Sequence, residues 1–164
     1  MRRLWAPWRM DYIRDEKPKV GCLFCQKLSE GNDAENLVLH RTERAFVMMN
    51  LYPYGNGHLM VAPRRHTGDL LDLSAEEMGD VMALAQRSVS ILTQALDAHG
   101  FNLGLNLGEA AGAGITEHLH VHIVPRWRAD TNFMPILADV KVMPEHLQSS
   151  YEVLRPQFSS DGKG

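Results

Sequence analysis

The sequence predicts an α+β domain in which a five-stranded antiparallel sheet is covered by one long helix. Its 164 residues, 45% of them hydrophobic, fit one domain with an ordinary core. Five short apolar or alternating segments are mostly bounded by glycine, proline or asparagine, which is typical of strands. A single long segment between the third and fourth of them has helical spacing.

The predicted strands are short, and the connections between the first three are shorter than a helical crossover needs. Those links favour antiparallel neighbours. The five segments are 36–40, 45–50, 58–63, 101–107 and 118–124.

The predicted helix begins with Ser74, and Glu77 lies three residues further on, as in a capping box. Gly100 ends the pattern, so the helix is expected within 74–99. Its apolar residues recur at helical spacing and are expected to face the sheet: Met78, Val81, Met82, Ala85, Val89, Leu92 and Leu96.

Composition also limits the location and the partners of the protein. No stretch approaches the roughly 18 apolar residues of a membrane helix, so we expect a cytoplasmic protein that contacts no membrane. A net charge of −3 argues against a broad nucleic-acid surface but permits a small anionic ligand. We expect one domain over 1–155, with an extension at 1–20, and a disordered tail over 156–164.

Three histidines alternate with aliphatic residues in the last predicted strand. Alternate side chains of a strand share a face, so His118, His120 and His122 form a row with about 7 Å between successive members. Leu119, Val121 and Ile123 would then face the core. A row of imidazoles can hold a metal, or can supply a nucleophile with neighbours that fix its tautomer. Spacing alone leaves both open.

"HLHVHIV" resembles the signature of the histidine triad superfamily of nucleotidyl hydrolases and transferases. The resemblance runs from Cys22 to Pro125 and implies a HIT-like fold with a short N-terminal zinc-ribbon-like segment. "FVMMNLYPYGNGHLMVAPRRH" is similar to the strand, turn and strand of that family, and "LNLGEAAGAGITEHLH" to its phosphate loop. "LWAPWRMDYI", "CLFC" and "VPRW" resemble the bacterial branch of diadenosine tetraphosphate phosphorylases and ATP adenylyltransferases.

The resemblance assigns catalytic roles to four histidines. His120 is the expected nucleophile, which attacks the α-phosphorus and forms a nucleotidyl-histidine that a second acceptor resolves. His122 is expected to contact the phosphate and assist the leaving oxygen, and His58 to support the row from the adjacent strand. His118 completes the catalytic set.

Substrate-binding residues also follow from the resemblance. Asn50 and Asn106 match positions that contact ribose or phosphate, and Leu51 is the expected wall for the base. The phosphates are expected along the glycine-rich loop, although 113–115 lacks the serine, threonine or glutamine of many relatives. The remaining candidates in this loop are Gly112, Gly114 and Ile115. Trp127, just after the last predicted strand, is a candidate from its position alone for contact with the polyphosphate or the distal base; Arg126 and Arg128 are left out.

Cys22 and Cys25 form a C-x-x-C pair without a thioredoxin-like context, which favours a metal over redox chemistry. Triad relatives with this pair complete a zinc site with two histidines, and the matching positions are His66 and His118. Four protein ligands would make the zinc structural. No organic cofactor is expected.

The expected reaction is phosphorolysis of diadenosine tetraphosphate, with hydrolysis of dinucleoside polyphosphates or of adenosine phosphoramidates as alternatives. A nucleotide-binding sensor and a metallohydrolase with all three histidines on one metal are alternatives of other classes. The resemblance also implies a homodimer, with an interface formed by the "LWAPW" segment or by the helix at 74–99.

Overall fold

The structure is a computed structural model and describes residues 21–128, 130 and 146–159. Three helices lie in this part of the chain. In the sequence, α2 (Leu23–Ser29) precedes the strands, α3 (Ala75–Leu96) follows the third strand, and α5 (Leu147–Ser159) follows the last strand. The strands are β1 (Val38–Arg41), β2 (Ala45–Met49), β3 (Leu59–Pro63), β4 (Gly100–Leu105) and β5 (Val121–Arg126). Short 3-10 turns, η1 (Leu70–Asp72) and η2 (Glu109–Ala111), precede α3 and β5.

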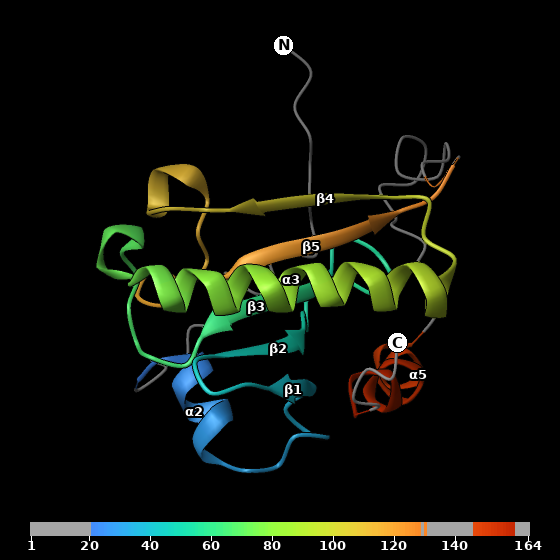
Figure 1. Cartoon of the computed structure of the whole chain (residues 1–164), viewed down its shortest axis with the longest axis horizontal. Coiled ribbons are helices and arrows are strands. Elements are labelled where there is room, and N and C mark those ends of the chain that lie inside the picture. Colours follow the sequence, from blue (N-terminus) through green and yellow to red (C-terminus); the bar gives the residue numbers. More distant parts are fainter. Residues whose placement is uncertain (1–20, 129, 131–145, 160–164) are drawn as a thin grey trace.

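The five strands form one antiparallel sheet in the order β1-β2-β3-β5-β4, which confirms the predicted fold class. β1 and β4 are the edges, and α3 lies across the sheet (Figure 1). Each predicted strand appears within a few residues of its expected place. β5 differs most, because it begins at Val121 and leaves His118 and His120 before the sheet.

Helix α3 has the predicted capping box. Ser74 Oγ accepts the N–H of Glu77, and the Glu77 carboxylate accepts the N–H of Ser74. The helix ends at Leu96, earlier than expected, because Asp97 adopts the left-handed conformation. Met82 was expected to face the sheet, and this prediction is wrong: its side chain is 47% exposed and lies outside the core.

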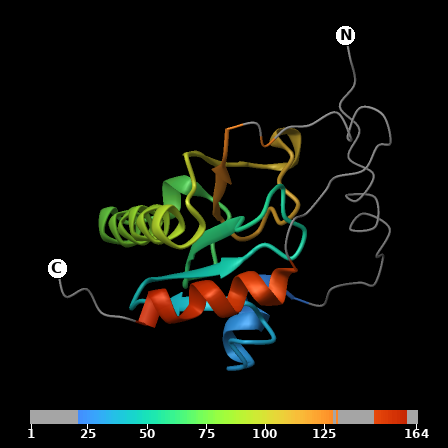
Figure 2. The ribbon, with the colours of Figure 1, turned by 90° about the vertical axis from the view of Figure 1, so that its right-hand side faces the viewer.

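The main core lies between the sheet and the two long helices, α3 and α5. Leu92, Val47 and Ile123 are fully buried within it, and Phe158 of α5 is buried equally. Helix α5 contacts β1 and α3 (Figure 2). The tail expected from residue 156 is therefore wrong for 156–159, which belong to α5; residues 160–164 lie outside the described residues.

The opposite face of the sheet has a smaller apolar cluster beneath α2. Phe24 of this helix is fully buried and packs edge-on against Phe46, whose ring centroid lies 6.0 Å away. The cysteine segment is thus helical rather than ribbon-like, and it covers the sheet beside the histidines. The "LWAPW" segment lies outside the described residues. Among the described helices, none has the length and apolar character to span a membrane.

Candidate active site

The histidine row enters the sheet through a contact with the segment that follows β3. The Leu119 N–H donates to the carbonyl of Thr67 at 2.7 Å. Gly68 passes so close to the main chain of Thr116 that an added Cβ would overlap its carbonyl oxygen. This approach requires glycine and fixes the path of the chain just before His118.

The predicted division of the strand into two faces is confirmed. Val121 and Ile123 lie in the core beneath α3, whereas His118 and His120 face the other side. Phe24 lies between these two histidines, with its ring centroid 5.0 Å from each of theirs. The first two histidines of the row are therefore shielded from water, since His118 and His120 are 0% and 6% exposed, whereas His122 is only partly buried.

The tautomer of His120 follows from its main-chain partner. Nδ1 lies 2.8 Å from the carbonyl oxygen of His118, and a carbonyl only accepts, so Nδ1 bears the hydrogen. Nε2 then has a lone pair. Burial lowers the pKa of His120, which keeps the ring neutral. A neutral imidazole with an unprotonated Nε2 is a competent nucleophile.

His122 and His58 form a hydrogen-bonded pair beside His120, the predicted nucleophile. Nε2 of His58 lies 3.0 Å from Nδ1 of His122, and the ring centroids of His120 and His122 are 4.8 Å apart. His58 is fully buried on the approach to β3. The structure therefore brings together His58, His120 and His122, three of the four histidines predicted to be catalytic.

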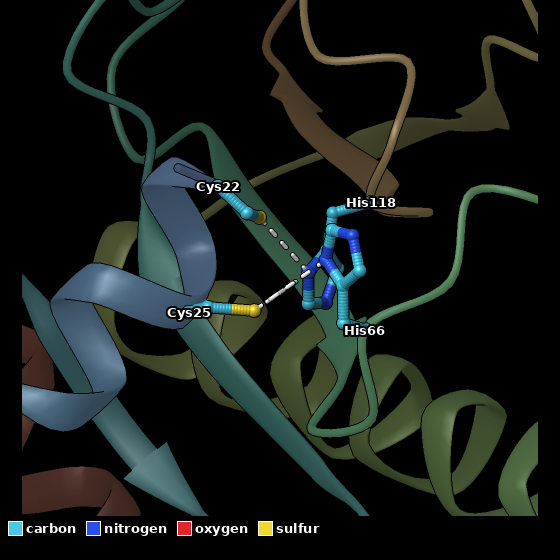
Figure 3. A group of neighbouring side chains, drawn as sticks. All are labelled: Cys22, Cys25, His66 and His118. Atoms are coloured by element: carbon cyan, nitrogen blue, oxygen red, sulfur yellow. Dashed lines mark hydrogen bonds between the residues drawn. The ribbon is translucent and has the colours of Figure 1, made fainter. Parts of the chain in front are cut away.

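The four predicted metal ligands converge on one point (Figure 3). Nδ1 of His118 lies 3.3 Å from Cys22 Sγ and 3.7 Å from Cys25 Sγ, and Nδ1 of His66 lies 3.5 Å from Cys25 Sγ. Tetrahedral zinc with ordinary Zn–S and Zn–N bonds places sulfur and nitrogen about 3.5 Å apart. The donor set and its spacing thus fit zinc.

The surroundings of the ligands also fit a metal. Nε2 of His118 donates to the carbonyl of Pro63 at 2.8 Å, which leaves Nδ1 as the coordinating atom. Burial lowers the pKa of His118, so the ring is neutral as a ligand must be. Burial and Cys22 raise the pKa of the Cys25 thiol, whereas a redox-active cysteine requires a lowered pKa.

Asn50 and Leu51 lie next to the histidine pair. The Asn50 side chain accepts the N–H of Tyr52 through Oδ1 at 2.9 Å, and its Nδ2 lies 3.4 Å from Nδ1 of His58. Leu51 is 51% exposed, so an apolar surface is open beside Asn50. Their roles toward ribose and base stay predictions.

The glycine-rich loop surrounds η2 and is largely exposed. Gly112 has a φ of 84°, which favours glycine, and its N–H donates to Glu109 within the loop. The Gly112 amide is therefore turned inward in this conformation. Ile115 packs against the apolar cluster that contains Phe24. This contact places the end of the loop beside the histidines. Asn106, Gly112, Gly114 and Ile115 stay predictions as phosphate-binding residues.

Comparison with known proteins identifies the architecture around these histidines. The model of the HIT domain family matches residues 32–129, more than half of the chain. The chain belongs to the HIT domain family. It is 39% identical over 166 residues to a Mycobacterium tuberculosis protein named AP-4-A phosphorylase, with 97% of this chain and 85% of the relative covered.

Other relatives show the range of the HIT family. A Dictyostelium discoideum bis(5'-adenosyl)-triphosphatase is 34% identical over 93 residues, which cover 57% of this chain and 62% of that protein. A solved Zn-bound histidine triad family protein from Mycobacterium smegmatis has a TM-score of 0.69 at 27% identity. That comparison covers 85% of this chain and 94% of the other.

Trp127 lies away from the histidines of the HIT domain. It follows the last residue of β5, about 20 Å along the strand from His120. Its indole N–H donates to the carbonyl of Leu96 at the end of α3. Arg126, which was left out of the predicted site, pairs with Asp130. The structure does not bring Trp127 together with the row of its own chain.

Two residues of the HIT domain site were missed by sequence reasoning. Phe24 was overlooked although it lies inside the "CLFC" motif, where an aromatic residue between two ligands was the available signal. Tyr54 stacks on His58 with 4.9 Å between centroids and 19° between planes. Its main-chain N–H donates to Nδ1 of His58 at 3.0 Å, and no side-chain pattern encodes that bond.

Proposed function

We propose that this HIT domain protein cleaves diadenosine tetraphosphate and transfers the adenylyl group to inorganic phosphate. His120 attacks the α-phosphorus and ATP leaves, and phosphate then resolves the adenylyl-histidine to give ADP. The observation that carries the proposal is the hydrogen bond from His120 Nδ1 to the His118 carbonyl, which leaves Nε2 nucleophilic. The name of the M. tuberculosis relative supports the choice of substrate and acceptor.

Hydrolysis of dinucleoside polyphosphates is the second candidate. It is favoured by the D. discoideum triphosphatase and by a Schizosaccharomyces pombe bis(5'-nucleosyl)-tetraphosphatase that is 33% identical over 93 residues. Both candidates share the adenylyl-histidine and differ only in the second acceptor. A nucleotide-binding sensor would form no covalent bond.

The test is to incubate the protein with diadenosine tetraphosphate, with and without phosphate, and to identify the nucleotides by chromatography. Phosphate-dependent ADP together with ATP supports phosphorolysis, whereas AMP and ATP regardless of phosphate indicate a hydrolase. A radiolabelled adenine substrate should label the native chain but not His120→Ala. Turnover by this variant should fall by at least about a thousandfold. His99→Ala, at a half-exposed histidine, is the matched control.

We also propose that Cys22, Cys25, His66 and His118 bind a structural zinc ion. The convergence of their donor atoms to within 4.8 Å of one another supports this, and so does the Zn-bound relative from M. smegmatis. When bound, the ion would fix the side chain of His118 and the first turn of α2. The reacting groups are the chain's own histidines.

We propose further that the protein is a cytoplasmic homodimer that acts on small nucleotides and binds neither nucleic acid nor membranes. Strand β4 is an edge of the sheet, and among the described residues it pairs with β5 alone. Three leucines along and just after it are between 37% and 46% exposed: Leu103, Leu105 and Leu107. An apolar edge suits a second copy of the same strand. The net charge of −3 favours a small-molecule partner over nucleic acid.

A further inference from the structure

The β2–β3 loop, residues 50–58, contains the predicted nucleotide contacts Asn50 and Leu51. Its two ends are joined by a hydrogen bond from the N–H of Asn50 to the carbonyl of His58 at 2.9 Å. The side chain of Asn50 is held within the loop, since its Oδ1 accepts the N–H of Tyr52 at 2.9 Å. The placement of both predicted contacts therefore depends on how this loop is fixed to the rest of the protein.

The second half of the β2–β3 loop packs against α3 and β5. Gly57 has a φ of 67°, which favours glycine. A Cβ added there would lie 2.6 Å from Leu96 Cδ1 of α3 and 3.4 Å from Pro125 Cγ of β5. Both of these elements lie within residues 32–129, the span that the HIT domain model matches.

A third attachment of the loop comes from α5, which lies after that span. Ser150 Oγ donates to Oδ1 of Asn56 at 3.0 Å, so the beginning of α5 is joined to the loop. Ser150 is fully buried, and a buried hydroxyl is costly to leave without a hydrogen bond. The bond therefore ties Asn56 to a helix that belongs to the core.

Further contacts hold α5 in place, so that Ser150 has a fixed position. Phe158 is fully buried in the main core. The hydroxyl of Tyr151 donates to the carbonyl of Val38 in β1 at 3.1 Å. Arg87 of α3 donates to the carbonyl of Phe158 at 2.8 Å. A helix that is fixed to β1, to α3 and to the core is a rigid support for a binding loop.

We infer that Ser150 is a positioning residue for nucleotide binding, which acts through Asn56 on the conformation of the β2–β3 loop. The part of the ligand concerned is the nucleoside, because Asn50 and Leu51 are the predicted contacts to ribose and base. The inference rests on the proposed function for the nature of the ligand. It gives α5 a role in binding, whereas the chemical step is left to the histidines beside β5.

The decisive experiment compares two fully buried serines in the full chain. Ser150→Ala removes the donor to Asn56. Ser88→Ala is the matched control, because it removes a hydroxyl that donates within α3 to the carbonyl of Leu84 at 2.7 Å. AMP is the probe, since it contains the nucleoside and binds without turnover. Calorimetric titration should give a dissociation constant about fivefold higher in Ser150→Ala, the loss expected for one hydrogen bond, and an unchanged constant in Ser88→Ala.

Amide hydrogen exchange examines the loop itself. The N–H of Tyr54 donates to Nδ1 of His58, and the N–H of Asn50 donates to the His58 carbonyl, so both amides report on loop opening. In Ser150→Ala they should exchange about fivefold faster, and in Ser88→Ala at the native rate. A merely structural role of Ser150 would instead speed exchange throughout the core and leave AMP affinity unchanged.

A double-mutant cycle examines the route from α5 to the loop. Asn56→Ala should weaken AMP binding about as much as Ser150→Ala, and the double variant should lose no more than either. Additive losses would show that Ser150 acts by another route and would overturn the inference. If Ser150→Ala does not fold, Asn56→Ala decides, because it leaves α5 intact: native AMP affinity and native loop exchange in that variant would also overturn the inference.

Turnover of diadenosine tetraphosphate separates this inference from the proposed function. KM should rise about fivefold in Ser150→Ala while kcat stays the same, because the bond supports binding and not the transition state alone. Equal AMP affinity and equal loop exchange in Ser150→Ala and Ser88→Ala would overturn the inference and leave phosphorolysis intact. A native protein that binds AMP but cleaves no dinucleotide would overturn the proposed function alone, and one that binds no AMP would overturn both.

Discussion

Gly68 and Thr116 lie in direct main-chain contact, although 48 positions separate them in the sequence. A Cβ on Gly68 would overlap the Thr116 carbonyl oxygen and lie 3.1 Å from the main chain of Glu117. Thr67, which precedes Gly68, accepts the N–H of Leu119, and His66, a predicted zinc ligand, precedes Thr67. On the other segment, His118, the second histidine ligand, lies two residues after Thr116. The contact therefore sets the spacing between the two histidine ligands.

Gly68→Ala should destabilise the protein by about 1–3 kcal/mol, because the added methyl group meets main chain that cannot rotate away. It should also weaken zinc binding, since His118 moves with the displaced chain. Chemical denaturation and zinc titration measure the two effects. Gly79→Ala is the control: nothing lies within 4 Å of its added Cβ in α3, and stability should rise by about 0.5–1 kcal/mol. Equal stability changes in both variants would contradict the importance of the contact.

Zinc removal should lower the melting temperature of the native protein. A ligand present at 1,000 times its dissociation constant stabilises by about 4 kcal/mol, which corresponds to a shift of roughly 10 °C here. Thermal unfolding with and without a strong chelator measures the shift. Cys25→Ser should unfold at the lower temperature and show no response to the chelator. A purified native protein without zinc and without a chelator effect would refute the metal site.

Acidification should destabilise the fold below the ordinary pKa of histidine. Burial holds the pKa of His118 and His120 below 6.5, so the unfolded chain takes up these protons first as the pH falls. The free energy of unfolding should be fully present above pH 6.5 and fall below it, by at most about 1.4 kcal/mol per pH unit for each histidine. Denaturant titrations at pH 7.5 and 5.5 measure it. The dependence should be weaker in His120→Phe.

Charge on the edge strand should break the proposed dimer. Leu103→Glu places a carboxylate at an exposed position of the edge strand β4, where the carboxylates of two copies would repel each other. Light scattering should then give the mass of one 18.5 kDa chain, compared with twice that mass for the native protein. Leu71→Glu is the control, because Leu71 is 90% exposed on η1 and lies outside β4. A native protein of monomer mass at micromolar concentration would refute the dimer.

Local patterns predicted most of the sheet and α3. Alternation and turn residues encode a strand directly, and the pairing of Ser74 with Glu77 encodes a helix start. Helix α5 was not predicted, because what holds 156–159 in place is the burial of Phe158 against the core. Composition alone makes such a segment look like a tail. Helix α3 ends early because Asp97 adopts the left-handed conformation. Glycine or asparagine at that position would have predicted the helix end more clearly than aspartate does.

Much of the site could also be predicted from the sequence. The row of histidines and the four metal donors follow from residue types and a family resemblance, and the structure places those donors within 4.8 Å of one another. The start of β5 at Val121 could not be predicted, since His118 and Leu119 are held by a distant segment through Thr67. The covering role of Phe24 depends likewise on how α2 packs.

Both groups that set the proton positions on His58 and His120 belong to peptide units: the N–H of Tyr54 and the carbonyl of His118. Substitution of a side chain leaves these groups in place, apart from proline at position 54. The hydrogen positions on His58 and His120 are therefore set by the path of the backbone. Relatives that differ at position 54 but keep this path should share the same tautomers.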